Sequence, residues 1–173
     1  MYLYLIRHGI AVDLDPLTVD AIASDELRSL TKAGRKKVAQ VADRLAELEL
    51  RFDLIITSPL VRARQTADIL LDKQLSPTLE VSDRLKPAGT IESWLMEWSA
   101  RSHDISTIST VALVGHEPNL SEWAELFLFG RSEGKIILKK SGIIGLKFTD
   151  NFKVGAAQLG CLIPPKYLLG SRS

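Results

Sequence analysis

Two histidines of this chain stand just after apolar runs, where catalytic side chains of α/β proteins gather. His8 comes two residues after the run Met1–Ile6, and His116 comes two residues after the run Val111–Val114. Both runs are typical of buried strands, and the ends of parallel strands meet at one edge of a doubly wound sheet. Two ring nitrogens delivered there can converge on one small ligand, although a lone histidine after a strand is more often part of a turn.

Arginines are predicted at the same edge of the sheet. Arg7 directly precedes His8, and Arg62 follows Ser58-Pro59 after a second apolar segment. The planar guanidinium fork matches phosphate oxygens and keeps its charge at any ordinary pH. Helices that begin after prolines in these connections would add free backbone N–H groups, which also favour an anion. The residue types therefore predict a phosphoryl-binding pocket.

Histidine can also react with the group that it binds. A neutral ring nitrogen is a nucleophile toward phosphorus, and the phosphoramidate that forms can afterwards be hydrolysed. Two guanidinium cations nearby favour the neutral ring, whereas a bound phosphate dianion acts in the opposite direction. The sequence has no Asp-x-Asp pair on a glycine turn, no His-Glu-x-x-His motif, no paired cysteines and no Walker lysine. We therefore predict phosphoryl transfer with neither a metal nor an organic cofactor.

The composition is that of a globular protein, and we predict one domain over residues 1–173. Hydrophobic residues make up 46% and charged residues 25% of the chain, so neither a fibre nor a membrane protein is expected. The net charge of +1 predicts no nucleic-acid partner, and we expect the short basic clusters Arg35–Lys37 and Lys139-Lys140 to be solvated. A single cysteine, Cys161, and an apolar start too short for a secretory signal predict a cytoplasmic protein.

Strand-like and helix-like segments alternate along the chain, which is typical of an α/β domain. We predict a three-layer sandwich: a mainly parallel central sheet, helices on both faces, and antiparallel edge strands near the C-terminus. The polar connection Val12–Ser29 is long for a compact domain and is expected to be functional or mobile. Strands are predicted at residues 2–6, 53–57, 79–81, 110–114, 136–138, 143–148 and 156–162, and helices at residues 31–48, 61–72, 90–100 and 118–129.

Four fragments of the sequence resemble the signature of the histidine phosphatase superfamily. The short chain is similar to the SixA-type phosphohistidine phosphatase branch of that superfamily, and the match extends over residues 1 to about 129. The resemblance implies a phosphoglycerate mutase-like fold. The fragments are Arg7-His8-Gly9, Leu30–Gly34, the segment from Ser58 to Ala67, and Gly115-His116.

The resemblance also implies a role for each residue of the predicted pocket. His8 would be the nucleophile that becomes phosphorylated, with Arg7 and Arg62 holding the phosphoryl oxygens. His116 would donate a hydrogen bond to the same group and stabilise the charge of the transition state. These four residues are the predicted catalytic set.

Two further residues are predicted to contact the substrate. Gly9 would let the backbone approach closely, its alternative being a simple turn glycine, and Ser58 could reach the ligand or instead cap a helix. Two other residues are interpreted as solvated. Arg64 would face away from Arg62 on a helix, and His103 lies in a polar loop.

A proton donor for the leaving group is harder to assign. Superfamily members that cleave stable phosphate esters carry an acidic donor, because an alkoxide leaves poorly without a proton. Glu117 directly follows His116 and is the candidate, its alternative role being to complement the N-terminus of its helix. Asp83 and Glu92 flank the turn after the third strand.

The substrate prediction follows from the leaving group. Phosphohistidine depends less on an acid, since its nitrogen leaving group can carry its own proton, and no large insertion between Val81 and Val111 closes over the site. We therefore predict hydrolysis of phosphohistidine on a phosphorylated protein, such as a phosphorelay or phosphotransfer domain. The alternatives are a phosphatase or mutase for small phosphorylated molecules and a non-catalytic phosphoryl-binding module.

Overall fold

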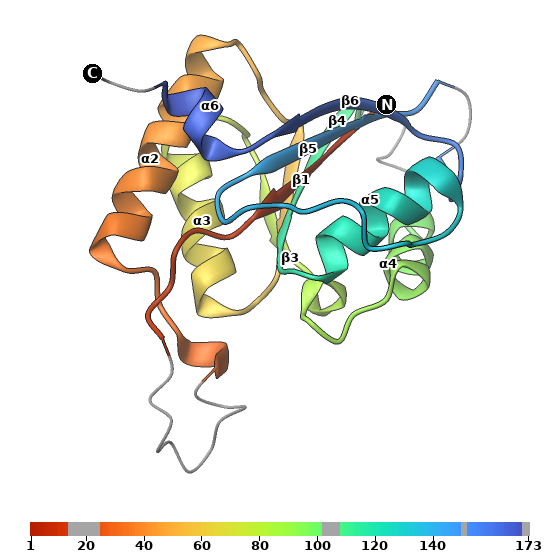
Figure 1. The fold of residues 1–173 in the computed structure, drawn as a ribbon, viewed down its shortest axis with the longest axis horizontal. Coiled ribbons are helices and arrows are strands. Elements are labelled where there is room, and N and C mark those ends of the chain that lie inside the picture. The colour runs from red at the N-terminus through yellow and green to blue at the C-terminus, as the bar shows by residue number, and fades with distance from the viewer. Residues whose placement is uncertain (14–24, 102–107, 150–151, 171–173) are drawn as a thin grey trace.

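The computed structural model describes residues 1–13, 25–101, 108–149 and 152–170. The strands among these residues form one six-stranded sheet. The strands are β1 (Tyr2–Arg7), β2 (Leu54–Thr57), β3 (Leu79–Val81), β4 (Thr110–Gly115), β5 (Ile143–Lys147) and β6 (Gln158–Ile163). Their order in the sheet is β3-β2-β4-β1-β5-β6 (Figure 1). The pairs among β1 to β4 are parallel and the pairs that involve β5 and β6 are antiparallel, so the predicted sheet is confirmed.

Helices lie on both sides of the sheet, as predicted for a three-layer sandwich (Figure 1). The helices are α2 (Lys32–Glu47), α3 (Val61–Asp72), α4 (Ile91–Ser99), α5 (Asn119–Phe129) and α6 (Pro165–Leu169), and a short 3-10 helix, η1 (Asp83–Leu85), follows β3. α2, α3 and α6 cover one face of the sheet, and α4 and α5 cover the other.

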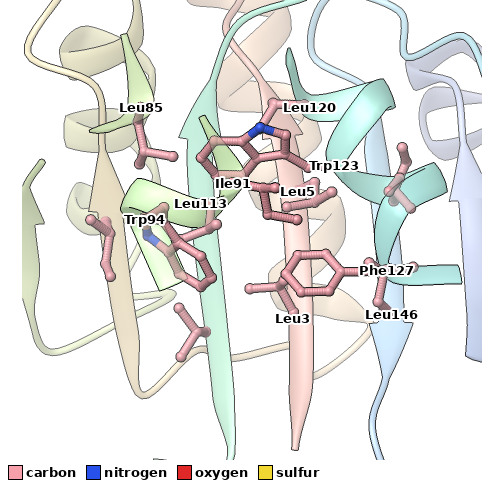
Figure 2. Close-up of a cluster of buried hydrophobic side chains, with 14 of the residues drawn as sticks. Leu3, Leu5, Leu85, Ile91, Trp94, Leu113, Leu120, Trp123, Phe127 and Leu146 are labelled. Atoms are coloured by element: carbon pink, nitrogen blue, oxygen red, sulfur yellow. The ribbon is translucent and has the colours of Figure 1, made fainter. Parts of the chain in front are cut away.

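The core under α4 and α5 is rich in aromatic side chains (Figure 2). Leu3 and Leu113 of the two central strands are fully buried there, together with Phe127 of α5. The helical spacing of Trp94 and Trp98 predicts core packing, and both rings are buried, with 5.6 Å between their centroids. Stacked tryptophans therefore hold α4 on this face.

The core under α2 and α3 is mainly aliphatic, and its small side chains let α3 lie close to the sheet. Ala63 and Ala67 of α3 are fully buried against the sheet. α2 begins after Thr31, whose Oγ1 accepts a hydrogen bond from Gly34 N at 2.9 Å, as expected for a helix cap. A Cβ on Gly34 would lie 2.1 Å from the carbonyl oxygen of Ile10, so α2 packs directly on the chain that follows β1.

The predicted strand at residues 136–138 is wrong, because its backbone groups bond to side chains instead of to a strand. Ile136 N donates to the carboxylate of Glu125 at 2.7 Å, and Leu138 N donates to Ser121 Oγ at 3.2 Å. Both acceptors belong to α5. The other predicted elements lie within two residues of the observed bounds.

Parts of two predictions concern residues outside the described ranges. Residues 14–24 of the connection Val12–Ser29 lie outside them, and so does His103. Among the helices that the structure describes, none is both long and apolar enough to cross a bilayer.

Candidate active site

The register of the parallel strands brings three predicted site residues to one point of the sheet edge. Arg7 at the end of β1 pairs with Gly115 at the end of β4, and β4 pairs in turn with β2. His8 N donates to Gly115 O at 3.1 Å, and Ser58 N donates to a carbonyl of β4 at 3.0 Å. As a result, the ring centroids of His8 and His116 lie only 5.1 Å apart.

One ring nitrogen of His8 contacts the backbone and orients the ring, and the other nitrogen is free to act as a nucleophile. Nδ1 lies 2.6 Å from Gly9 O, and because a carbonyl oxygen only accepts, Nδ1 carries the proton and Nε2 keeps its lone pair. Burial lowers the pKa of His8 to about 4, opposed by the bond to Gly9 and assisted by the charges of Arg62 and Arg7. His8 is therefore neutral at pH 7.

His116 is also a buried, neutral ring. Burial, together with His8 and the charge of Arg62, lowers the pKa of His116 to about 3. Its Nε2 lies 2.9 Å from Ser58 Oγ, whereas its buried Nδ1 has no partner among the described residues. A neutral ring carries one N–H, so if Ser58 donates its hydroxyl proton to Nε2, the Nδ1–H is free to donate to a ligand.

The remaining contacts of Ser58 and Gly9 explain their residue types. α3 begins after Leu60, which has no side-chain cap, so Ser58 is not the helix cap. Its hydroxyl instead accepts a hydrogen bond from Leu60 N at 3.3 Å and is hydrogen-bonded to Nε2 of His116. A Cβ on Gly9 would lie 2.6 Å from Val38 Cγ2, and Gly9 N donates to Thr66 Oγ1 at 3.1 Å. Packing between α2 and α3 therefore requires glycine at this position.

Arg62 lies in the first turn of α3, and its guanidinium binds a carboxylate that the sequence analysis did not identify. Nη1 donates to the backbone oxygen of Asp25 at 2.6 Å, and Nη2 donates to Asp25 Oδ2 at 2.9 Å. Burial opposes ionisation of Asp25, but hydrogen bonds from Arg28 and Arg62 outweigh it and lower the pKa of the carboxyl. Asp25 is one of several aspartates in Val12–Ser29, and no sequence pattern distinguishes it from the others.

Arg7 is held from the opposite side, by the segment that was wrongly predicted as a strand. Its Nη1 donates to Leu138 O at 2.9 Å. Ser141 N donates to the backbone oxygens of Arg7 and His8 at 3.1 and 3.2 Å, so this segment is fastened to the end of β1. The sequence contains no signal for this role, because it arises only when residues far apart in the chain meet.

Unsatisfied polar atoms are concentrated at this site. Within the described part of the chain, three buried side-chain atoms lack a hydrogen-bond partner: Arg7 Nε, His116 Nδ1 and Ser141 Oγ. Buried polar atoms without partners are rare, and they are expected where a ligand completes the bonding. A neutral nucleophilic ring, two guanidinium groups and a free ring nitrogen together suit the transfer of a phosphoryl group.

The contacts of Glu117 match its alternative role at the helix terminus. Its Oε1 accepts from Ser121 N at 3.2 Å, and its Oε2 accepts from Ser121 Oγ at 2.7 Å, in the first turn of α5. Burial raises the pKa of Glu117, against the opposing effects of Ser121 and the charge of Arg7. A raised pKa is also what an acid catalyst needs, so the role of proton donor stays a prediction.

The other acidic candidates lie at the surface. The side chain of Asp83 is 76% exposed and pairs with Lys86 at 3.0 Å, and Glu92 is exposed as well. Arg64 pairs with Asp68 at 2.8 Å and is 45% exposed, so its prediction as a surface residue is confirmed. No three histidine, cysteine or carboxylate side chains of the described residues are grouped so that they could hold a metal ion.

Comparisons with known proteins agree with this geometry. The family model for the histidine phosphatase superfamily (branch 1) matches residues 3–108. An uncharacterized protein of Picosynechococcus sp. is 41% identical over 180 residues, which cover 98% of this chain and 99% of that protein.

Solved structures share the fold. The protein histidine phosphatase SixA complexed with tungstate aligns with a TM-score of 0.78 and 24% identity, over 97% of this chain and 99% of that chain. An alpha-ribazole phosphatase from Shigella flexneri aligns with a TM-score of 0.66 and 17% identity, over 95% and 97% of the two chains. The family model and the Picosynechococcus relative show that this chain belongs to the histidine phosphatase superfamily, branch 1.

Proposed function

We propose that this chain is a phosphatase that works through a phosphorylated His8 and that its substrate is phosphohistidine on a protein. The observation that carries the proposal is the 2.6 Å contact between His8 Nδ1 and Gly9 O, which leaves Nε2 of the ring free to react. Its Nδ1 proton is engaged by a backbone oxygen, and its neutral Nε2 lies within electrostatic reach of Arg7 and Arg62. This is the state in which a histidine attacks phosphorus.

The reaction would proceed in two displacements. First, His8 Nε2 forms a bond to phosphorus while the bond to the leaving nitrogen breaks, and the bonding electron pair goes to that nitrogen. If the other nitrogen of the substrate ring carries a proton, the leaving group is neutral imidazole and no acid is consumed. Water then attacks phosphorus, the bond to His8 Nε2 breaks, and its electron pair returns to that nitrogen. Inorganic phosphate leaves with the protons of the water, one of which it can release to solvent.

Each remaining polar group has a role in this scheme. Arg7 and Arg62 would bind the phosphoryl oxygens, and the free Nδ1–H of His116 would donate to the oxygen on which charge develops. Ser58 would fix the tautomer of His116 through its 2.9 Å contact with Nε2. The carbonyl oxygen of Gly9 would orient the His8 ring by accepting a hydrogen bond from Nδ1–H, so the contribution of Gly9 to substrate binding is indirect.

Among the residues that the structure describes, both carboxylates near the site are already engaged, which favours a nitrogen leaving group. Glu117 is bound through both carboxylate oxygens to Ser121, and the carboxylate of Asp25 is paired with two arginines. A protein substrate also agrees with the shared fold of the protein histidine phosphatase SixA. Both observations support phosphohistidine over a phosphate ester.

A phosphatase for small phosphate esters is the second candidate, and Glu117 is the observation that favours it. Its raised pKa is a property of a general acid, and it directly follows His116. The alpha-ribazole phosphatase from Shigella flexneri shares the fold. Glu117→Gln separates the two candidates, because it would abolish ester hydrolysis but spare hydrolysis of phosphohistidine.

The deciding experiment compares substrates directly. The protein is incubated with a phosphohistidine-containing phosphotransfer protein and with a panel of sugar and nucleotide phosphates, and phosphate release is measured. We expect release from phosphohistidine at a kcat/KM well above that for any ester. Strong ester turnover without loss of phosphohistidine would contradict the proposal.

His8→Ala tests the phosphorylated intermediate and the third alternative, a module that only binds phosphate. We expect kcat to fall by about 1,000-fold or more. The acid-labile phosphoenzyme that we expect on rapid quenching of the wild type should be absent from the variant. Phosphate binding, measured by calorimetry, should survive because both arginines are intact. Loss of turnover with retained binding would exclude the binding-only alternative, whereas unchanged turnover would exclude His8 as the nucleophile.

A further inference from the structure

A groove of about 640 Å³ opens beside the active site and is lined by basic side chains. Its cations come from segments that are far apart in the sequence: the end of β1, the helix α2, the segment before β5, and the helix α6. Figure 1 shows α6 lying beside α2 near the turn that leads into β5. The cationic side chains are Arg7, Lys37, Lys139, Lys140 and Lys166.

These lysines carry uncompensated charge. Among the described residues, none of the four lysines of the groove forms an ion pair, and no acidic side chain lines the groove. Lys73 and Lys86, by contrast, pair with neighbouring carboxylates at 2.6 and 3.0 Å. Since the whole chain has a net charge of only +1, the positive potential here is local. Of the basic clusters that we expected to be solvated, Lys37 of the first and both lysines of the second line this one groove, whereas Arg35 and Lys36 are exposed outside it.

The groove borders the proposed phosphoryl site. Arg7 lines both of them. Lys140 lies close enough to His8 for its charge to act on the ring, and the backbone of the next residue, Ser141, bonds to the carbonyl of His8 at 3.2 Å. A substrate with its phosphoryl group on His8 would therefore extend directly into the groove.

The groove also has apolar lining residues. Pro164, Pro165 and the exposed ring of Tyr167 line it, together with Ile10. Lysine stems also offer apolar surface while their charged ends stay in water. A small polyphosphorylated molecule would leave the apolar residues unused, whereas a polypeptide segment with acidic and apolar side chains matches both kinds of lining residue.

We propose that this groove binds an acidic segment of the protein substrate next to its phosphohistidine. The proposal rests on the proposed function for the identity of the substrate, but the groove can be tested without turnover. Complementary charge of this kind raises the rate of encounter and favours one partner over others, and its effect falls with added salt.

The test reverses two charges of the groove and leaves Arg7 and Lys140, whose charges act on His8, unchanged. Lys139→Glu/Lys166→Glu is the variant, because both side chains are exposed. The matched control is Lys147→Glu/Lys153→Glu, which changes the net charge equally. Both control lysines are exposed, and Lys147 pairs in register with Tyr2, at the opposite end of β1 from His8.

Two measurements separate this proposal from the proposed function. The first is the affinity of a fluorescent acidic peptide without phosphohistidine, measured by anisotropy. We expect the groove variant to weaken binding about tenfold, which corresponds to ~1.4 kcal/mol, and the control to leave it unchanged. Equal affinity in both variants, or tighter groove binding of inositol hexakisphosphate than of the peptide, would overturn the proposal.

The second measurement uses two phosphohistidine peptides, one with acidic and one with neutral flanking residues. We expect the groove variant to raise KM about tenfold for the acidic peptide, with kcat and the neutral peptide unaffected. If KM for the acidic peptide does not change, the groove does not bind the substrate. If the wild type binds the acidic peptide through the groove but hydrolyses neither phosphopeptide, peptide binding by the groove is supported and the proposed phosphohistidine phosphatase activity is contradicted.

Discussion

At the scale of single residues, the protonation of His8 depends on burial more than on any one neighbour. The ring is 6% exposed, and burial lowers its pKa to about 4, with Arg62 and Arg7 acting in the same direction. A histidine at its ordinary pKa of 6.5 would be partly charged at neutral pH and would lose its nucleophilic lone pair. Burial therefore activates His8 without any partner base.

The lowered pKa of His8 predicts how kcat/KM falls at acid pH. For an acid-stable phosphate ester, kcat/KM of the free enzyme should be level from pH 8 to about 5 and should fall about tenfold per unit below pH 4, as His8 becomes protonated. A midpoint near 6.5 would show that burial does not control the ring. Circular dichroism at each pH is the control, because a histidine with a depressed folded pKa contributes stability above pH 6.5 and loses it as the pH falls.

The ion pair between Asp25 and Arg62 leads to a prediction about anion binding. Its carboxylate is 31% exposed and occupies Nη2 of Arg62, so a phosphoryl group must compete with it. Asp25→Asn keeps the shape and removes the charge. We expect the inhibition constant of inorganic phosphate to fall about fivefold, which corresponds to ~1 kcal/mol.

The control for Asp25 is Asp68→Asn on the same helix as Arg62. Asp68 pairs with the surface residue Arg64 at 2.8 Å, so its removal should leave the inhibition constant unchanged. A weaker affinity for phosphate in Asp25→Asn would mean that the carboxylate serves mainly to position Arg62.

At the scale of elements, one carboxylate organises the irregular segment that supports Arg7. Glu125 of α5 accepts hydrogen bonds from Glu133 N, Gly134 N, Lys135 N and Ile136 N and from Ser132 Oγ. The segment then reaches Leu138, whose carbonyl oxygen binds Arg7. α5 is thereby connected to the active site without contacting the substrate.

Glu125→Gln should therefore destabilise the fold in a pH-dependent way. Burial opposes ionisation of Glu125, but the backbone hydrogen bonds from Ile136 and Glu133 lower the pKa from 4.5 to about 2. The stabilisation is thus present above pH 4.5 and is lost as the pH falls toward 2. We expect urea unfolding to show a loss of about 2 kcal/mol at pH 7 that shrinks between pH 4.5 and 2.5.

Glu133→Gln is the matched control for this carboxylate. Its side chain is 48% exposed and pairs with Arg131, so we expect almost no change in the free energy of unfolding. An equal loss in both variants, or a loss in Glu125→Gln that does not depend on pH, would contradict the role of Glu125.

The same contacts explain which elements could be predicted from the sequence. β1, β2 and β4 are continuous apolar runs that lie largely buried in the sheet. Such a run is typical of a buried parallel strand, so these strands can be predicted from their own residues. Residues 136–138 have a similar apolar character, but the backbone N–H of Ile136 donates to the carboxylate of Glu125 and that of Leu138 donates to Ser121 Oγ. A hydrogen bond to a side chain on another element overrides local propensity, and no pattern within the segment reveals it.

At the scale of the whole molecule, the sheet separates an aromatic core from an aliphatic one, and the site lies where the central strands end. His8, Ser58 and His116 could be predicted because each directly follows a recognisable parallel strand. Asp25 and Ser141 could not, because they reach the site from segments whose paths depend on the completed fold.

This arrangement predicts that a bound anion stabilises the whole fold. Phosphate would satisfy buried donors that lack partners, such as Arg7 Nε, and would bind the native state alone. At phosphate concentrations about 100 times Kd, the free energy of unfolding should rise by about 2.7 kcal/mol, which is roughly 5 to 10 °C in Tm for a chain of this size. Arg62→Ala should abolish the rise, whereas Arg64→Ala, two residues along the same helix at the surface, should keep it. Each shift is measured against the same variant without phosphate, so a lower starting Tm does not obscure the result. A full shift in Arg62→Ala would place the anion elsewhere and remove Arg62 from the phosphoryl pocket.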